Sequence, residues 1–199
     1  MAAESLTTTT CLPNTHNSAL KGLTDTIGVT VVHPVWQKTK PGTDEHAGWF
    51  FGTTKEEADA EKPWTNPAGN GGPFSPHYPD TTPDPFTGSK SIREVYESVN
   101  DTNGKYTVPI LFDTKTKIIV NNESSEIIRM LNTEFNEFAT KPDLDLYPSE
   151  LRKAIDAVNE WVYPNLNNGV YRCGFAKSQT AYNQAIKELT EAFDKMDEI

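Results

Sequence analysis

The chain has 199 residues, of which 36% are hydrophobic, and this composition supplies a packed core rather than a disordered chain. Its formal net charge of −10 argues against nucleic acid or an anionic membrane as a partner. Because no apolar run approaches the roughly 18 residues of a membrane helix, and residues 1–10 lack the pattern of a secretory signal, we expect a cytoplasmic protein without a membrane segment.

The first part of the chain alternates between polar and apolar stretches. Residues 1–18 are polar, with four consecutive threonines and no periodicity, so they are predicted to be a flexible leader. From Ile27 a short β-branched run predicts a buried strand. Residues 53–85 are rich in proline and glycine and are predicted to be a loop without regular structure. A loop of that length is either functional or a mobile insertion.

Two predicted helices flank a predicted hairpin. Apolar residues at intervals of three and four predict a helix over residues 89–99, which Ser89 or Ser91 can cap. Residues 105–112 predict a strand, and residues 117–120 follow closely enough to form a tight hairpin with it.

The second of these helices follows the hairpin directly. It is predicted over residues 121–132, with Ser124 or Ser125 as its cap. The resulting order is strand, helix, strand, strand, helix. It matches an α/β thioredoxin-like domain over residues 19–139 whose first strand and first helix are missing, because that pair needs roughly 25 residues at typical lengths.

The remaining residues, 140–199, are predicted to be helical after a linker. Ser149 and Ser178 can each cap a helix that carries one wide apolar stripe. Two such helices need further partners to cover their stripes. We therefore expect a truncated all-helical domain at the C-terminal end.

Val108 and Pro109 interrupt the predicted strand at 105–112. In a thioredoxin-like fold, a cis proline at this place leaves the backbone N–H and C=O of the preceding residue free to pair with a short peptide. The alternative is an edge-strand proline that binds nothing.

The run Asn-Asn-Glu-Ser-Ser at 121–125 joins a predicted strand to a predicted helix. N–H groups at a helix N-terminus favour a carboxylate, and Glu123 beside Ser124 offers a negative charge for an ammonium. The alternative is a plain N-cap followed by a solvated acid. Pro109 lies 14 positions before Glu123, a spacing with which the hairpin brings both features to one end of the sheet.

Three other side chains are weaker candidates for ligand contacts. Arg93, near the start of its helix, could neutralise a carboxylate, or could be a solvent-exposed helix residue. Trp49 could donate its indole N–H to a peptide or pack in the core. Tyr171 could face an aromatic ligand or be a buried tyrosine with a local partner. The histidines and cysteines show no metal-binding spacing, and we expect no metal.

These segments resemble the glutathionyl-hydroquinone reductases, also called the xi class and often labelled omega-like glutathione transferases. The resemblance covers about residues 19–199, and the Asn-Asn-Glu-Ser run is highly specific to the group. The segments that carry it are 27–36, 48–49, 91–96, 105–110, 119–136 and 167–176.

The resemblance implies both a ligand and a reaction. Glutathione would be held by matching positions of the motifs, and Tyr171 would line the aromatic site. A cysteine thiolate attacks the thioether sulfur of a glutathionyl-hydroquinone, free hydroquinone leaves, and a second glutathione releases the resulting protein–glutathione disulfide. The implied glutathione-binding residues are Trp49, Arg93, Val108, Pro109, Glu123 and Ser124.

The family carries its cysteine in a Cys-Pro-Trp-Ala motif at the start of the first helix, and this chain departs from that pattern. Cys11, followed by Leu-Pro-Asn, is the candidate nucleophile, although it lies only ten positions before Lys21. Cys173 is expected to be structural. The alternative is a catalytically impaired, truncated relative that keeps part of the glutathione site. The family's homodimer is not expected to carry over, because the last helices and their dimer contacts are missing.

Overall fold

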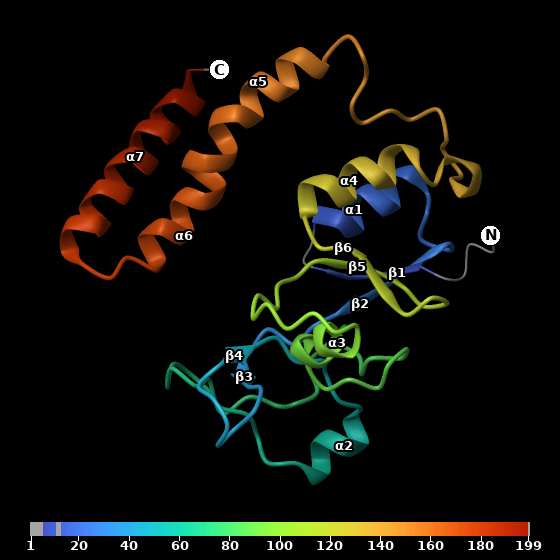
Figure 1. Ribbon diagram of the computed structural model, residues 1–199, viewed down its shortest axis with the longest axis vertical. Coiled ribbons are helices and arrows are strands. Elements are labelled where there is room, and N and C mark those ends of the chain that lie inside the picture. The colour runs from blue at the N-terminus through green and yellow to red at the C-terminus, as the bar shows by residue number, and fades with distance from the viewer. Residues whose placement is uncertain (1–5, 11–12, 199) are drawn as a thin grey trace. The chain divides into compact units, whose positions relative to one another are not determined.

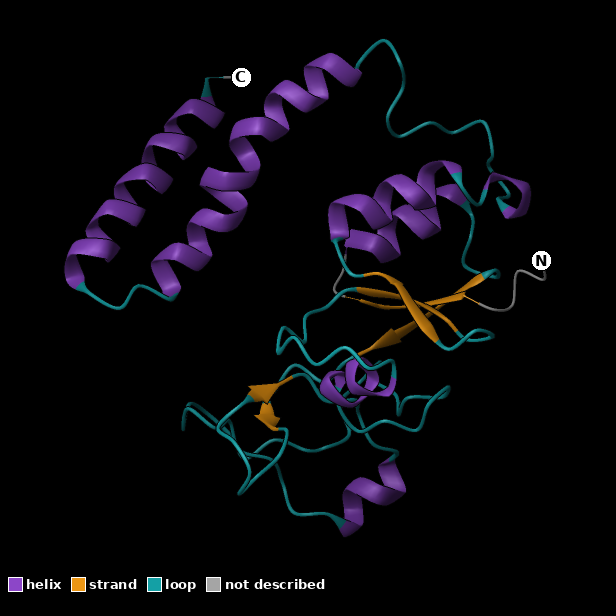
Figure 2. Ribbon diagram, viewed as in Figure 1, coloured by secondary structure: helices purple, strands orange, loops and turns teal. Residues whose placement is uncertain are grey.

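The computed structural model describes the backbone of residues 6–10 and 13–198, and the side chains of residues 16–198. The chain divides into two compact units, Met1–Asp145 and Leu146–Ile199 (Figure 1). The first unit is built around a mixed sheet with helices, and the second is helical (Figure 2). None of the helices within the described ranges is both long and apolar enough to cross a membrane.

A four-stranded sheet with the order β2-β1-β5-β6 forms the centre of the first unit. The connection from β1 to β2 passes through α1, and the two strands are parallel. The pairs β1–β5 and β5–β6 are antiparallel, and this is the order of a thioredoxin-like domain. The bounds are β1 Leu6–Thr10, α1 Pro13–Lys21, β2 Ile27–Val31, α3 Ile92–Ser98, β5 Ile110–Asp113, β6 Ile118–Asn121 and α4 Ser124–Thr133.

The prediction of a flexible leader at residues 1–18 is wrong for the residues that the structure describes. The prediction that the first strand and the first helix are missing is also wrong. Residues 6–10 form β1 between two neighbouring strands, and α1 begins at Pro13. The polar character of the threonine run obscured its high strand propensity, which comes from branching at Cβ. Proline is also well suited to the first position of a helix. The two elements fit into 16 residues, fewer than the typical lengths suggested.

Alternating residues of β5 separate two apolar cores. Ile110 and Phe112 pack with α3, whereas Leu111 packs with α4 on the opposite face. Figure 1 shows α1 and α4 together on one side of the sheet and α3 on the other. The buried residues of the two cores include Ile92, Val95 and Tyr96 on the α3 side, and Leu23, Ile27, Ile127 and Leu131 on the α4 side.

Helix caps differ in part from the expectations. Ser91 caps α3, and its hydroxyl accepts a hydrogen bond from the Glu94 N–H. In α4 the cap is Glu123 rather than a serine, since its carboxylate accepts from the Ser125 N–H.

The region 53–85, predicted to be a loop without regular structure, is not wholly irregular, because the helix α2 (Lys55–Ala60) lies within it.

His33 ties the region 53–85 to the segment that follows β2. The ring is fully buried, with Nε2 3.0 Å from the Ser75 carbonyl oxygen and Nδ1 3.0 Å from the Val35 N–H. Trp64 and Tyr78 contact the same ring edge-on, at 4.7 Å and 5.7 Å between ring centroids. Such contacts make this long insertion part of the first unit's packing.

The expected boundary between residues 139 and 140 lies too early, because the first compact unit extends to Asp145. The buried Lys21 ammonium, at the end of α1, donates to the carbonyls of Pro142 at 3.1 Å and Leu144 at 2.8 Å. The Thr140 N–H also donates to the Gly22 carbonyl at 3.2 Å. The predicted linker is therefore fastened to the first unit.

The second unit contains two long helical segments, and one of them is irregular. Ser178 caps the last helix of the unit, as predicted. The expected cap at Ser149 is wrong, because the first helix of the unit begins at Arg152 without a side-chain cap. Pro164 has no N–H to continue the α-helical ladder, and a π-helical turn forms there. The segments are α5 Arg152–Val162, the π turn Tyr163–Asn167, α6 Asn168–Gly174 and α7 Gln179–Asp197.

Gly22 is expected to tolerate no side chain. Its φ is +68°, and a Cβ there would overlap the Thr140 side chain. Gly22→Ala should lower the free energy of unfolding by about 2–5 kcal/mol, which combines backbone strain with overpacking. Gly42→Ala is the control, since φ is +81° and no atom lies within 4 Å of the added Cβ. Urea unfolding that gave equal losses for the two variants would contradict the overlap.

The stability of the protein is expected to fall as the pH drops below about 6.5. Burial lowers the pKa of His33 below its ordinary 6.5, so the unfolded chain takes up this proton first. The stability that comes from keeping His33 neutral in the fold is complete above pH 6.5. It is lost as the pH falls towards the lower pKa of the folded state, at up to about 1.4 kcal/mol per pH unit. Urea titrations at pH 7.5 and 5.5 should show a shallower dependence in His33→Gln. The same slope in both proteins would contradict this role.

Candidate functional site

The segment Val108–Pro109 and the turn before α4 meet at one end of the sheet. The Val108–Pro109 peptide bond is cis. The β5–β6 ladder pairs Leu111 with Asn121, so continuing its antiparallel register brings Pro109 opposite Glu123. The hairpin thus brings the two predicted features together, as their spacing of 14 residues indicated.

The start of α4 presents both signs of charge within two residues. The Glu123 carboxylate oxygen Oε1 lies 3.3 Å from the Ser125 N–H nitrogen and 3.2 Å from its hydroxyl. The Glu123 N–H donates to Asn121 Oδ1 at 2.7 Å, which fixes the turn. Ser124, half-buried, is the first residue of the helix. A helix N-terminus attracts a carboxylate, and Glu123 next to it attracts a cation.

Trp49 follows β4 in the chain, and its backbone contacts the first residue of α3. Its carbonyl accepts a hydrogen bond from the Ile92 N–H at 3.0 Å, and its half-buried ring packs against the α3 core. The Trp36 ring meets it edge-on at 5.3 Å between ring centroids. Core packing, the alternative reading of Trp49, therefore describes part of its surroundings.

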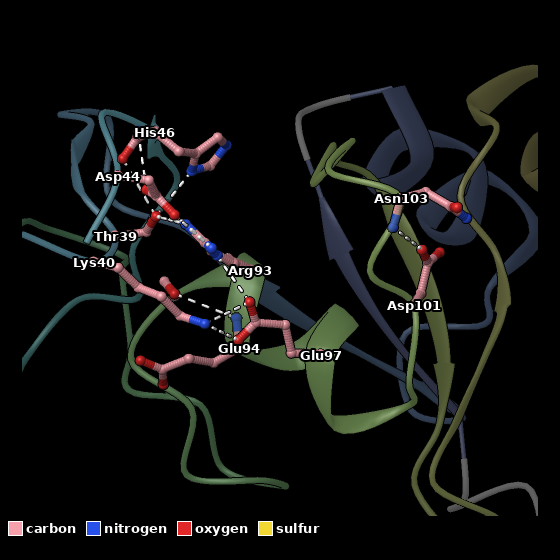
Figure 3. Close-up of polar contacts among 10 residues, drawn as sticks. Thr39, Lys40, Asp44, His46, Arg93, Glu94, Glu97, Asp101 and Asn103 are labelled. Atoms are coloured by element: carbon pink, nitrogen blue, oxygen red, sulfur yellow. Dashed lines mark hydrogen bonds and ion pairs between the residues drawn. The ribbon is translucent and has the colours of Figure 1, made fainter.

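Arg93 connects α3 to the turn between β3 (Gln37–Lys38) and β4 (Ala47–Gly48) (Figure 3). Its Nη2 lies 2.8 Å from Asp44 Oδ2, and its Nε lies 2.9 Å from Glu97 Oε1. Nη1 donates to Thr39 Oγ1 at 3.0 Å. The side chain is only 11% exposed. The sequence left open a ligand carboxylate as its partner or a solvent-exposed position. The side chain is not solvent-exposed, and these protein groups occupy most of its donors.

Arg93, Asp44 and Glu97 form a charged cluster, and the hydrogen bonds among them favour the ionised form of each. The bonds to Asp44 and then to Glu97 raise the pKa of Arg93. Those from Lys40 and Arg93 lower the pKa of Glu97, and the one from Arg93 lowers the pKa of Asp44. Burial lowers the pKa of His46, and the Arg93 charge acts in the same direction. The cluster thus fixes the hairpin that leads to Trp49.

The other predicted residues lie apart from this group in the chain. Cys11 falls outside the described residues, after β1 ends at Thr10 and before α1 begins at Pro13. In the second unit, Tyr171 is 63% exposed and stacks on Phe175 at 6.4 Å between ring centroids. This contradicts the expected alternative of a buried tyrosine. Cys173 is a half-buried free thiol.

Sequence reasoning missed the polar role of Tyr96 and Asn122. Tyr96 is one of the apolar residues whose spacing predicts the helix over residues 89–99, yet its hydroxyl donates to the Thr107 carbonyl at 3.0 Å. The Asn122 side-chain amide donates to the same hydroxyl at 3.0 Å. The only available signal was that a buried tyrosine hydroxyl needs a partner.

Two pockets lie elsewhere in the first unit. One of about 490 Å³ has an aromatic wall that includes Phe50 and Trp64, and one of about 610 Å³ includes Trp36. Neither is lined by the residues at the end of β5 and β6. Within the part of the chain that the structure describes, no group of three or more His, Cys, Asp or Glu side chains is placed to hold a metal ion.

Comparison with known proteins gives a consistent set of relatives. No protein-family model matches the chain. The chain is 37% identical to "Glutathione S-transferase omega-like 2" of Saccharomyces cerevisiae, over 91% of the chain and 53% of that protein. It is 45% identical to "Glutathionyl-hydroquinone reductase PcpF" of Sphingobium chlorophenolicum, over 65% of the chain and 41% of that protein. The chain thus spans about half the length of the curated relatives it matches.

Solved structures agree with these relatives. The Xi glutathione transferase ECM4 of Saccharomyces cerevisiae in complex with glutathione superimposes with a TM-score of 0.79 at 34% identity, over 98% of this chain and 59% of that chain. The glutathione-bound structure of YqjG from Escherichia coli gives a TM-score of 0.75 at 31% identity, with 98% and 56% covered.

Removing the Arg93 charge is expected to loosen the hairpin from α3. Arg93→Met leaves Asp44 without its cation and Glu97 with Lys40 alone, and should cost about 1–2 kcal/mol of unfolding free energy. Hydrogen exchange at the Thr39 amide, which bonds to the His46 carbonyl, should accelerate. Lys187→Met removes one charge from an exposed pair at 3.8 Å and should change stability by under about 0.5 kcal/mol. Similar effects of the two variants would count against the cluster's role.

Proposed function

We propose that this protein, a relative of the xi-class and omega-like glutathione transferases and of the glutathionyl-hydroquinone reductases, binds glutathione at the end of β5 and β6. One observation carries the proposal. The β5–β6 register directs the cis Val108–Pro109 segment and the Glu123–Ser124 turn to the same end of the sheet, which supports the binding of one small peptide by both. Two similar solved structures are described as bound to glutathione, which supports the same ligand here.

The cysteinyl and γ-glutamyl parts of glutathione each have a matching group in this site. The backbone N–H and C=O of Val108 pair with the cysteinyl residue as a short antiparallel strand. Ser124 and the α4 N-terminus take the γ-glutamyl carboxylate, and Glu123 takes the ammonium. Trp49 covers the peptide and donates its indole N–H. Arg93 contributes charge near the site and orders the hairpin before Trp49.

The proposed reaction is the reduction of a glutathionyl-hydroquinone, with Cys11 as the nucleophile. The Cys11 thiolate attacks the glutathione sulfur, the carbon–sulfur bond to the ring breaks, and the ring carbon takes up a proton to give the hydroquinone. A second glutathione thiolate then attacks the mixed disulfide, which releases glutathione disulfide and the Cys11 thiolate. Two electrons thus pass from two thiols to the aromatic carbon.

The position of Cys11 just before α1 supports this role. Only Leu12 separates it from the helix that begins at Pro13. A helix N-terminus stabilises a thiolate and lowers its pKa. The short spacing of ten positions between Cys11 and Lys21 leaves room for the helix, because α1 spans nine residues, Pro13–Lys21. Tyr171 is proposed to contact the aromatic part of the substrate.

The thiol chemistry is tested by exchanging each cysteine for serine. With glutathionyl-menadiol and glutathione, the wild type should release menadiol and glutathione disulfide, measured by chromatography. Cys11→Ser should lose roughly a thousandfold or more in kcat/KM. Cys173→Ser, which changes a free thiol of the second unit, should keep the activity.

Mass spectrometry separates the outcomes. With the glutathionyl substrate alone, the wild type should gain one glutathione on Cys11. If the wild type binds glutathione but forms no adduct and no product, it is the binding-only relative. If it binds no glutathione in calorimetry, the proposed site itself is wrong.

A further inference from the structure

The β5–β6 ladder does not extend to the two segments of the proposed glutathione site. Its last pair is Leu111 with Asn121, after a register shift between Leu111 and Phe112. Val108 lies three residues before this pair, and Glu123 two residues after it. The ladder brings the two segments to the same end of the sheet, but it ends before it reaches them, so a further contact is needed to fix their separation.

A single hydroxyl group bridges them. Tyr96, in α3, is 1% exposed, and its hydroxyl donates to the Thr107 carbonyl at 3.0 Å. The same oxygen accepts from Asn122 Nδ2 at 3.0 Å. One phenol can make both bonds at once, because it has one donor and two acceptor sites. Thr107 directly precedes Val108, and Asn122 directly precedes Glu123.

We infer that Tyr96 is a positioning residue of this site, which holds the peptide-pairing segment and the α4 N-terminus at a fixed separation. The inference rests on the proposed glutathione binding and adds a residue that does not touch the ligand. Tyr96 acts through Thr107 and Asn122. A tripeptide that engages both segments gains affinity when their separation is set before it binds.

Tyr96 is buried, whereas its two partners are exposed, and this difference separates a positioning role from a purely structural one. Thr107 and Asn122 are exposed, so their carbonyl and amide can bond to water when the hydroxyl is absent. The Tyr96 ring itself is packed in the α3 core and is retained in phenylalanine. Tyr96→Phe should therefore keep the fold and lose the fixed separation.

The test is glutathione affinity measured by isothermal titration calorimetry. Tyr96→Phe should raise the dissociation constant about five- to tenfold, the effect of one to two hydrogen bonds. Tyr106→Phe is the matched control, because it removes a hydroxyl from a neighbouring ring 5.7 Å away. Its dissociation constant should stay at the wild-type value. Thermal unfolding of each variant verifies that the fold is retained.

A double-mutant cycle shows whether Tyr96 acts through Asn122. Asn122→Ala should weaken glutathione binding in the wild type and cause no further loss in Tyr96→Phe. Additive losses, as general loosening would give, would overturn the inference. So would a Tyr96→Phe protein that binds as tightly as the wild type. If Tyr96→Phe does not fold, full affinity in Asn122→Ala overturns it. A wild type that binds no glutathione removes the proposed function, and this inference with it.

Discussion

The antiparallel pairing of β5 with β6 is the constraint on which the rest of the site depends. It aligns Leu111 with Asn121, and so brings a cis-proline segment next to a helix N-terminus. The same strand, β5, pairs with β1 and divides the two apolar cores. A one-residue slip would exchange the faces of Ile110 and Leu111, so the packing of both cores enforces the geometry of the site.

Much of this arrangement could be predicted from local patterns. The spacing between Pro109 and Glu123 indicated that a hairpin joins them, and Ser91 and Ser178 were suitable caps. These features depend on neighbouring residues only. The polar start of the chain was misinterpreted, because residues 6–10 form a strand through pairing with β2 and β5, which are distant in sequence. Periodicity within a segment carries no information about such partners.

The surroundings of the candidate residues were harder to predict than their positions. Besides Glu97 in the same helix, the partners of Arg93 lie 49 and 54 positions away, in a turn that gave no sequence signal. Tyr96 matched an apolar stripe, and nothing local revealed that its hydroxyl joins two segments of the site. Side-chain networks of this kind depend on tertiary contacts, which a single sequence does not display.

The buried Lys21 ammonium has a consequence for the order in which the first unit folds. Its two acceptor carbonyls lie 121 and 123 positions further along the chain. During synthesis, the end of α1 therefore stays unfinished until the segment containing Pro142 and Leu144 has emerged. Contacts of such long sequence separation slow folding, since a large loop must close before they form. The end of α1 thus reaches its final contacts only after a much later part of the chain has been made.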